Sequence, residues 1–288
     1  MKKLLVQLDT DAQSSLFDTV VAYDGGADHV VSYPAITPEN VGGLVEGAIF
    51  TRGPKDKKNT ALFIGGGNLA AGEALMQAVQ QRFFGKFRVS VMLDSNGANT
   101  TAAACVAWLV RDRSVAGKRA VVLGGTGPVG QRVAVMLSQA GAQVAITGRQ
   151  LARTEQVCLA IRERFGYSVE AVEAPGLAER GEVICGAQIV VSTGASGVAM
   201  LSENQWQGLP GLELLADANA SPPLGIAGID MMDRATQRHG ILTFGPLGFG
   251  ALKLALHREC ISCLFESNDM VLDAREIFER ASHKVNFL

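Results

Sequence analysis

The chain has 288 residues, 48% of them hydrophobic, which suffices for one large or two ordinary domains with sizeable cores. Its formal net charge of −2 gives no electrostatic reason to expect binding to nucleic acid or to an anionic membrane. Asp9 and Asp11 interrupt the apolar start, and no apolar run is long enough to span a membrane, so we expect a first strand and a cytoplasmic protein. The four histidines form no metal-binding pattern with the five cysteines, so no metal is expected.

Residues 1–98 alternate strand and helix signals, which predicts a parallel sheet covered by helices. A helix is expected to begin at Thr37, with Pro38 at its first helical position. The other expected elements are strands at 4–8, 29–33, 60–64 and 87–93, a further short strand at 47–51, and helices at 14–22 and 68–83.

Two turns of this half suggest a ligand site. Gly66 lies in a glycine run between a strand and a helix, where open α/β sheets bind ligands, although a plain connection would look similar. The second turn follows the last strand and begins at Asp94. Its amide and hydroxyl side chains, together with Gly66, are assigned to substrate binding: Asn96, Asn99 and Thr100. Asn99 is also a natural N-cap for a helix at 100–110.

The segment 124–130, Gly-Gly-Thr-Gly-Pro-Val-Gly, separates an apolar run at 120–123 from an apolar-periodic helix at 129–140. It fits the G-x-G-x-x-G fingerprint of a dinucleotide-binding βα unit. The first glycine permits the tight turn, the second lets the backbone approach a pyrophosphate, and the third lets helix and strand pack closely. N–H groups at the helix start favour phosphates. The expected cofactor contacts in this segment are Gly125, Thr126, Gly127, Pro128, Val129 and Gly130.

The residues after the next strand indicate which dinucleotide binds. NAD-binding units place Asp or Glu about 20 residues past the fingerprint, whereas this chain has Thr147, Gly148 and Arg149 there, with Arg153 one helical turn later. A guanidinium can fork onto a phosphate that a carboxylate would repel. The sequence therefore predicts NADP, with Thr147 at the site, Arg149 as the principal 2′-phosphate ligand and Arg153 as its helper. Two solvated arginines at a helix start are the alternative.

Further strands at 189–192, 214–217 and 241–244 continue this half. Small and polar residues follow two of them at the edge where a dinucleotide lies. The residues assigned to the cofactor site there are Ser192, Thr193, Gly194, Ala195 and Asn219. A loop containing Pro222 and Pro223 would look similar for structural reasons alone. The glycine-rich segment 245–250 then begins a long helix back to the first half, and a helix is expected at 271–282.

These elements predict an α/β chain of two domains. The first is an N-terminal parallel α/β domain at residues 1–98, completed by C-terminal helices at about 250–288 that return to it. The second comprises a linking helix and a Rossmann NADP-binding domain at residues 99–249.

Three segments resemble the NADP-dependent methylene-tetrahydromethanopterin dehydrogenases of methylotrophic bacteria. They are residues 58–66, residues 94–103, and the glycine turn together with Arg149, and the resemblance runs the full length of the chain. It implies reversible oxidation of the methylene unit on tetrahydromethanopterin, and on tetrahydrofolate, to methenyl, with hydride passing to NADP⁺ in an interdomain cleft that holds the pterin. It also implies homo-oligomers, with a trimer or hexamer expected.

The implied reaction demands few catalytic groups. The methylene carbon lies between two nitrogens whose lone pairs stabilise the cation left by hydride departure, so no acid–base pair is required, only reactive geometry and exclusion of water. A carboxylate could favour the cation, which makes Asp94 a candidate, although an Asp after a strand is often a turn former. Lys253 on the returning helix could bind the pterin or lie along the surface.

Three other protein classes share part of this pattern. Shikimate-type NADP-dependent dehydrogenases share the layout but need a Lys–Asp pair, which residues 1–98 do not clearly supply. Short-chain dehydrogenases need Tyr-x-x-x-Lys, and Tyr23, Tyr33 and Tyr167 each lack a lysine four residues later. A non-catalytic NADP-binding sensor would need no substrate domain facing the polar turn at Asp94.

Overall fold

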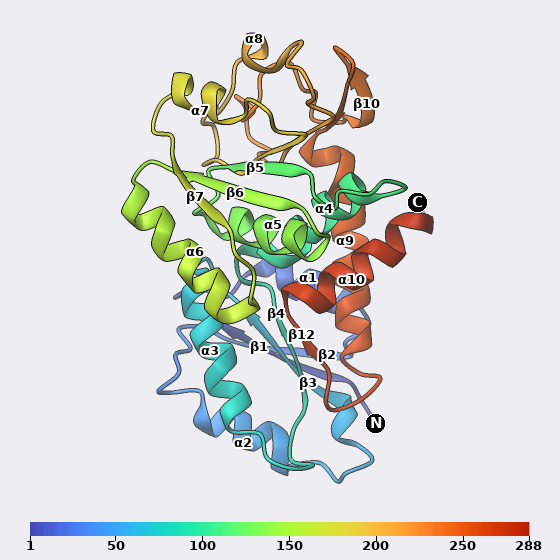
Figure 1. Cartoon of the computed structure of the whole chain (residues 1–288). Coiled ribbons are helices and arrows are strands. Elements are labelled where there is room, and N and C mark those ends of the chain that lie inside the picture. The colour runs from blue at the N-terminus through green and yellow to red at the C-terminus, as the bar shows by residue number, and fades with distance from the viewer. Residues whose placement is uncertain (288) are drawn as a thin grey trace. The chain divides into compact units, whose positions relative to one another are not determined.

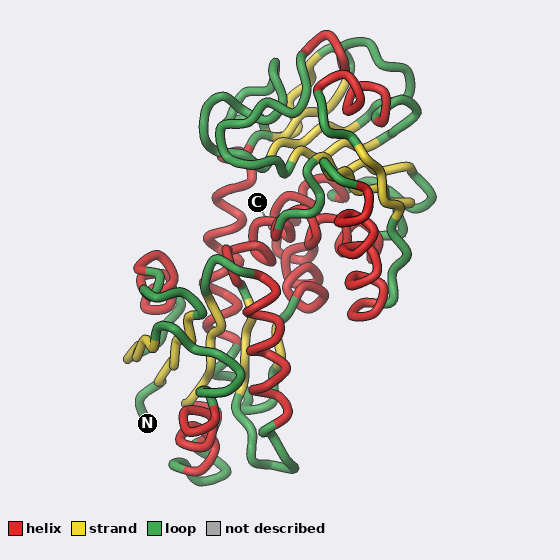
Figure 2. The backbone as a smooth tube through the Cα atoms, turned by 90° about the vertical axis from the view of Figure 1, so that its left-hand side faces the viewer, coloured by secondary structure: helices red, strands yellow, loops and turns green. Residues whose placement is uncertain are grey.

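A computed structural model describes residues 1–287. The chain divides into two compact units, and in each one a sheet is covered by helices (Figures 1 and 2). Unit 1 comprises Met1–Thr100 and Leu254–Ile277, and unit 2 comprises Thr101–Lys253 and the residues from Phe278 onward. Helices α4 (Ala98–Val110), α9 (Pro246–Cys263) and α10 (Ala274–Lys284) each carry the chain from one unit to the other. The predicted α/β class is confirmed, although the residues from Phe278 belong to unit 2 rather than unit 1.

Unit 1 contains a parallel sheet in the order β12-β4-β3-β1-β2. Alternate residues of the inner strands point to one face, so Val6, Leu62 and Val91 share a core with residues of α2 and α3. The bounds of the elements are β1 (Leu4–Asp9), α1 (Leu16–Asp24), β2 (His29–Tyr33), α2 (Gly42–Phe50), β3 (Thr60–Gly65), α3 (Leu69–Gln81), β4 (Ser90–Leu93), β12 (Val271–Leu272) and α10 (Ala274–Lys284).

Three local predictions for this part of the chain are wrong. The expected strand at 47–51 is the end of α2, and that helix begins at Gly42 rather than at Pro38. Residues 37–41 form a turn instead, because the Asn40 side chain accepts the Thr37 N–H at 2.8 Å. The expected helix at 271–282 starts later, since residues 271–272 pair with β4 as strand β12. A two-residue strand carries no periodicity that a sequence could reveal.

Unit 2 contains a sheet in the order β10-β11-β9-β8-β5-β6-β7, parallel except for β10. Numbered along the chain from β5, the parallel strands follow the order 3-2-1-4-5-6 of dinucleotide-binding folds, whose ligands lie outside the carboxyl ends of the strands. The strands are β5 (Arg119–Leu123), β6 (Gln143–Gly148), β7 (Glu170–Glu173), β8 (Ile189–Ser192), β9 (Leu214–Asp217), β10 (Arg234–Arg238) and β11 (Ile241–Phe244).

Helices cover both faces of this second sheet (Figure 1). Helices α5 (Pro128–Gln139) and α6 (Leu151–Phe165) lie on one face, and α7 (Leu177–Val183) and α8 (Glu203–Trp206) lie on the other. The core under α7 and α8 includes Val190, Leu215 and Trp206. Within residues 1–287 no helix combines the length and the apolar character needed to cross a membrane.

Candidate active site

The glycine turn joins β5 to α5 and is supported by the end of β6. Gly124 has φ +69°, a conformation that favours glycine. Its N–H donates to the Thr147 hydroxyl at 3.1 Å, and the Gly125 N–H donates to the Thr147 carbonyl at 3.0 Å. Thr147, predicted at the cofactor site, is buried, and it supports the glycine turn through these two hydrogen bonds.

The three fingerprint glycines have different surroundings. A Cβ on Gly125 would lie 2.6 Å from the Ile146 Cβ, and one on Gly130 would lie 2.6 Å from the Gly125 Cα. A Cβ on Gly127, the N-cap of α5, would meet only the Gly124 carbonyl oxygen, at 3.7 Å. Gly125 and Gly130 therefore permit close packing, while Gly127 leaves open space before the helix, which fits a phosphate.

The residues around this space complete the helix start. Pro128 occupies the first helical position, where its missing N–H costs no hydrogen bond. The Gln131 side chain donates to the Thr126 carbonyl at 2.9 Å and fixes the turn. Thr126, Pro128 and Val129 are half-buried, and the first N–H groups of a helix have no acceptor within it. The turn thus presents backbone donors to an anion.

Beyond β6 the chain presents two arginines. Gly148 is packed so closely that a Cβ there would lie 2.1 Å from the Thr154 hydroxyl oxygen. Arg149 and Arg153 are exposed, and neither makes an ion pair or a hydrogen bond with any part of residues 1–287. Their guanidinium groups are therefore available to an anionic ligand.

The loop after β8 rests on the glycine turn. The Thr193 hydroxyl and N–H donate to the Leu123 carbonyl at 3.0 Å and 2.9 Å. A Cβ on Gly124 would lie 2.9 Å from the Gly194 Cα. Ser192 is buried at the end of the strand, and Ala195 is exposed. Ser192 to Gly194 therefore hold this loop in place, and Ala195 faces outward from it.

The loop after β9 is anchored by Asp217. Its buried carboxylate accepts the N–H groups of Asn219 at 3.0 Å and Ile226 at 2.9 Å. Burial raises the pKa of Asp217 despite these bonds, which lower it. Asn219 is buried as well, and its side chain accepts the Ser221 N–H at 3.0 Å and donates to the Pro223 carbonyl at 3.3 Å. The side chain of Asn219, predicted at the cofactor site, therefore holds this loop in shape.

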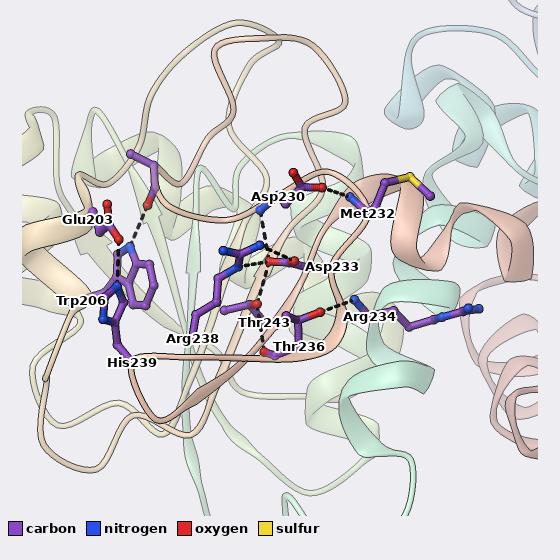
Figure 3. Close-up of polar contacts among 11 residues, drawn as sticks. Glu203, Trp206, Asp230, Met232, Asp233, Arg234, Thr236, Arg238, His239 and Thr243 are labelled. Carbon is purple, nitrogen blue, oxygen red and sulfur yellow. Dashed lines mark hydrogen bonds and ion pairs between the residues drawn. The ribbon is translucent and has the colours of Figure 1, made fainter.

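A polar network holds the hairpin of β10 and β11 at the start of α9 (Figure 3). Arg238 donates to the buried Asp233 carboxylate at 2.6 Å and 2.8 Å, and the Thr243 hydroxyl donates to it at 2.8 Å. Burial by itself would raise the pKa of Asp233, but the hydrogen bonds from Arg238, Thr243 and the Asp230 N–H together lower it. The Gly245 N–H donates to the Asp233 carbonyl at 2.8 Å, which fixes the chain where α9 begins.

At the carboxyl edge of the unit 1 sheet, Asp94 caps α4. Its Oδ1 accepts the N–H groups of Asn99 at 2.8 Å and Thr100 at 3.1 Å, and its Oδ2 accepts the Thr100 hydroxyl at 2.6 Å. The expectation that Asn99 is the N-cap is therefore wrong, because the 3₁₀ turn Ser95–Gly97 returns the chain so that Asp94 reaches the helix start. The Asn99 amide instead donates to the Leu93 carbonyl at 2.6 Å.

The other two predicted substrate residues of this edge lie together. The Asn96 N–H donates to the Gly66 carbonyl at 2.7 Å, and Asn96 has φ +57° and an exposed side chain. Gly66 has φ +101°, and a Cβ there would lie 2.0 Å from the Thr10 hydroxyl oxygen. Asn99 and Thr100 are buried, so the Asn96 amide is the predicted side chain that faces solvent.

Helix α9 brings a histidine beside Asp94. The His257 Nδ1 lies 3.9 Å from the Asp94 Oδ2, and both side chains are buried. The His257 ring stacks on Phe63 with centroids 5.5 Å apart, and its centroid lies 6.3 Å from that of Phe17. Phe17, in the first turn of α1, is 48% exposed, so this series of rings ends at the surface. Lys253 is half-buried one helical turn before His257 on α9.

Comparisons with known proteins place the chain in a family. The family described as methylene-tetrahydromethanopterin dehydrogenase, N-terminal, matches residues 16–96. Bifunctional protein MdtA of Methylorubrum extorquens is 52% identical over 282 residues, covering 97% of this chain and 98% of that protein. The NAD(P)-dependent methylenetetrahydromethanopterin dehydrogenase of the same organism is 30% identical over 290 residues, covering 97% and 98%. The chain belongs to the methylene-tetrahydromethanopterin dehydrogenases.

Membership of the methylene-tetrahydromethanopterin dehydrogenases confirms the resemblance predicted from the sequence. It also confirms the expected enzyme class, an oxidoreductase with a nicotinamide cofactor. The fold is similar to that of a shikimate 5-dehydrogenase from Listeria monocytogenes, with a TM-score of 0.54 at 14% identity over 96% of each chain. At that identity the similarity concerns the fold alone.

Several side chains around these candidate sites were not predicted from the sequence, among them Asp217, Phe17 and Arg180. Asp217 ends an apolar strand, and this position after three apolar residues was a visible signal. In the sequence Phe17 is one apolar residue of an expected helix, and only the fold shows that it lies near His257. Arg180 is buried on α7 and has no motif around it.

Proposed function

We propose that the enzyme reversibly oxidises the methylene group of methylene-tetrahydromethanopterin, and of methylene-tetrahydrofolate, to methenyl with NADP⁺ as the hydride acceptor. The observation that carries the proposal is the unpaired Arg149 beyond an open glycine turn, in a chain of this family. A cytoplasmic homo-oligomer is proposed on the resemblance alone.

The residues of unit 2 fit NADP. The open space at Gly127 and the N–H groups at the start of α5 suit the pyrophosphate, and Arg149 with Arg153 suits the 2′-phosphate. The loops at Ala195 and Asn219 lie at the carboxyl ends of β8 and β9, where the nicotinamide half of a dinucleotide lies in such folds. Bound NADP⁺ supplies the hydride acceptor, and the residues of unit 2 hold its nicotinamide ring in place.

The residues of unit 1 suit a pterin. A pterin ring has a flat face and an edge of hydrogen-bonding groups, so it needs an aromatic surface and an amide or carboxylate partner. Phe17 and the Asn96 amide are exposed at this edge and offer both. We assign Gly66 to the backbone beside Asn96, and Asn99 and Thr100 to holding the turn rather than touching the pterin. Lys253, on the part of α9 that belongs to unit 2, is also proposed as a substrate-positioning residue.

The chemistry explains why no acid–base pair is needed. The two nitrogens beside the methylene carbon stabilise the cation that remains after hydride leaves, and no proton moves in that step. The protein's task is to orient the reacting carbon and keep water away. Asp94 already accepts three hydrogen bonds from the start of α4, so we propose that it acts by fixing the Asn96 turn, with its negative charge a weaker, electrostatic contribution.

The proposal is tested by mixing the protein with NADP⁺ and either methylene-tetrahydromethanopterin or methylene-tetrahydrofolate and recording the absorbance of NADPH and methenyl product. Turnover is expected with both. Arg149→Ala should weaken NADP⁺ binding about tenfold or more while changing NAD⁺ binding little, because only NADP⁺ carries the 2′-phosphate. Absence of turnover with both pterins would refute the function, and equal losses for both dinucleotides would refute the role of Arg149.

A further inference from the structure

Arg180 is a buried cation whose hydrogen bonds all go to backbone carbonyls. It is 9% exposed. Its Nε donates to the Ala174 carbonyl at 3.3 Å, its Nη2 to the Pro175 carbonyl at 2.6 Å, and its Nη1 to the Ala199 carbonyl at 3.3 Å. Throughout residues 1–287, no carboxylate accepts a hydrogen bond from it. A buried charge without such a partner is costly, so its position calls for a functional reason.

Two of these carbonyls, those of Ala174 and Ala199, connect Arg180 to two segments of the predicted cofactor site. The Ala174 N–H donates to the Gly148 carbonyl at 2.9 Å, directly before Arg149. Ala199 belongs to the loop after β8, whose beginning rests on the glycine turn through Thr193. Arg180 therefore fixes the backbone beside the 2′-phosphate ligand and the loop beyond β8 at the same time.

The charges at this edge are nearly balanced. Two glutamates lie on the segments around Arg149 and Arg180. Glu173 accepts the Leu151 N–H at the start of α6 at 3.2 Å, and Glu179 lies in the first turn of α7, directly before Arg180. Burial lowers the pKa of Arg180, and the positive charge of Arg149 lowers it further against the opposing effect of Glu179. With Arg153, the three arginines exceed the two glutamates by one charge, and loss of Arg180 would leave the remaining four groups with no net charge. An anion beside Arg149 would relieve the repulsion between the arginines.

We propose that Arg180 is a positioning residue for the ribose 2′-phosphate of NADP⁺. It holds the backbone so that Arg149 faces the phosphate, and its unneutralised charge adds to the attraction. A residue that merely braced the loops would support NAD⁺ and NADP⁺ alike, so selectivity between the two distinguishes positioning from bracing. This inference rests on the proposed use of NADP⁺.

The test compares dissociation constants of NADP⁺ and NAD⁺, measured by titration calorimetry without pterin, for Arg180→Gln, Arg180→Lys and the matched control Arg162→Gln. Arg162 lies exposed on α6. Arg180→Gln should weaken NADP⁺ binding about tenfold and NAD⁺ binding less than about threefold, because only one ligand carries the phosphate. Arg180→Lys keeps the charge and should lose about threefold for NADP⁺. The salt dependence of NADP⁺ binding should fall in Arg180→Gln alone.

Equal weakening of both dinucleotides, or no weakening, would overturn the inference, as would the same selective loss in Arg162→Gln. Should Arg180→Gln fail to fold, Arg180→Lys decides: a selective loss of NADP⁺ supports the inference, and an equal or absent loss refutes it. Wild-type protein that binds NADP⁺ but does not turn over the pterins would refute the proposed function and leave this inference standing. Wild-type protein that does not prefer NADP⁺ to NAD⁺ would refute the inference itself.

Discussion

Asp94 follows β4, Asp217 ends β9 and Asp233 directly precedes β10, and in all three the carboxylate is buried and accepts at least one backbone N–H. Buried carboxylates with several such bonds fix the backbone around them. This use suits a reaction that moves no proton, because the proposed hydride transfer needs positioned ligands rather than a titrating side chain. These three aspartates hold loops at the carboxyl edges of the sheets.

Asp233 should make stability depend on pH in a defined direction. Its pKa is lowered from the ordinary 3.8, so its contribution is present above that value and is lost as the pH falls through the folded-state pKa. Asp233→Asn should lower the free energy of unfolding by about 2 kcal/mol at neutral pH, since charge-assisted hydrogen bonds to Arg238 and Thr243 are lost or weakened. Urea unfolding of both proteins should show this deficit shrinking in acid.

Asp230→Asn provides the matched control. Asp230 stands in the same turn, but it is exposed and its carboxylate accepts the Met232 N–H at 2.8 Å (Figure 3). Its replacement should change stability by no more than about 0.5 kcal/mol. A deficit in Asp233→Asn that stays constant from neutral to acidic pH would show that the Asp233 charge does not stabilise the hairpin.

At the scale of elements, Gly127 and Gly130 have different roles in the βα unit of β5 and α5. Gly127 leaves space for the ligand, and Gly130 permits close packing. Gly127→Ala places its methyl group in open space at φ −77° and ψ 168°, so folding stability should change by less than about 1 kcal/mol while NADP⁺ binds at least about tenfold more weakly. Gly130→Ala forces a methyl group against the Gly125 Cα and the Thr193 hydroxyl, which should destabilise the fold by about 1–3 kcal/mol. Denaturant unfolding and NADP⁺ titration measure the two effects separately.

Gly43→Ala is the control for a harmless methyl group, because Gly43 lies within α2 and nothing would meet its Cβ within 4 Å. Its stability should stay equal or rise by a few tenths of a kcal/mol, roughly the helix preference of alanine over glycine. If Gly127→Ala bound NADP⁺ as well as wild type, the pyrophosphate would not lie at the start of α5.

The sequence predicted elements whose signals are local. The apolar strands around the glycine turn and the helix behind it have strong periodicity and turn residues, and they form as expected. It failed where a contact outside the local pattern decides the outcome. Strand β12 exists because residues 271–272 meet the distant β4. Asn99 loses its capping role to nearby Asp94, which a 3₁₀ turn returns to the helix start. The bonds of Arg180 join loops after two different strands, and no spacing along the chain records them.

On the scale of the whole molecule, the division into two units predicts two separate ligand footprints in hydrogen exchange. NADP⁺ should slow exchange at residues 124–131 and 149–153, all within unit 2, because ligand binding stabilises the segments it contacts. Methenyl-tetrahydrofolate added alone should slow exchange at residues 65–68 and 94–100 in unit 1. NAD⁺ is the matched control: it should protect 124–131 but leave 149–153 nearly unchanged, since it lacks the 2′-phosphate. Pterin protection confined to unit 2 would contradict the assignment of the substrate to unit 1, whatever the enzyme's turnover.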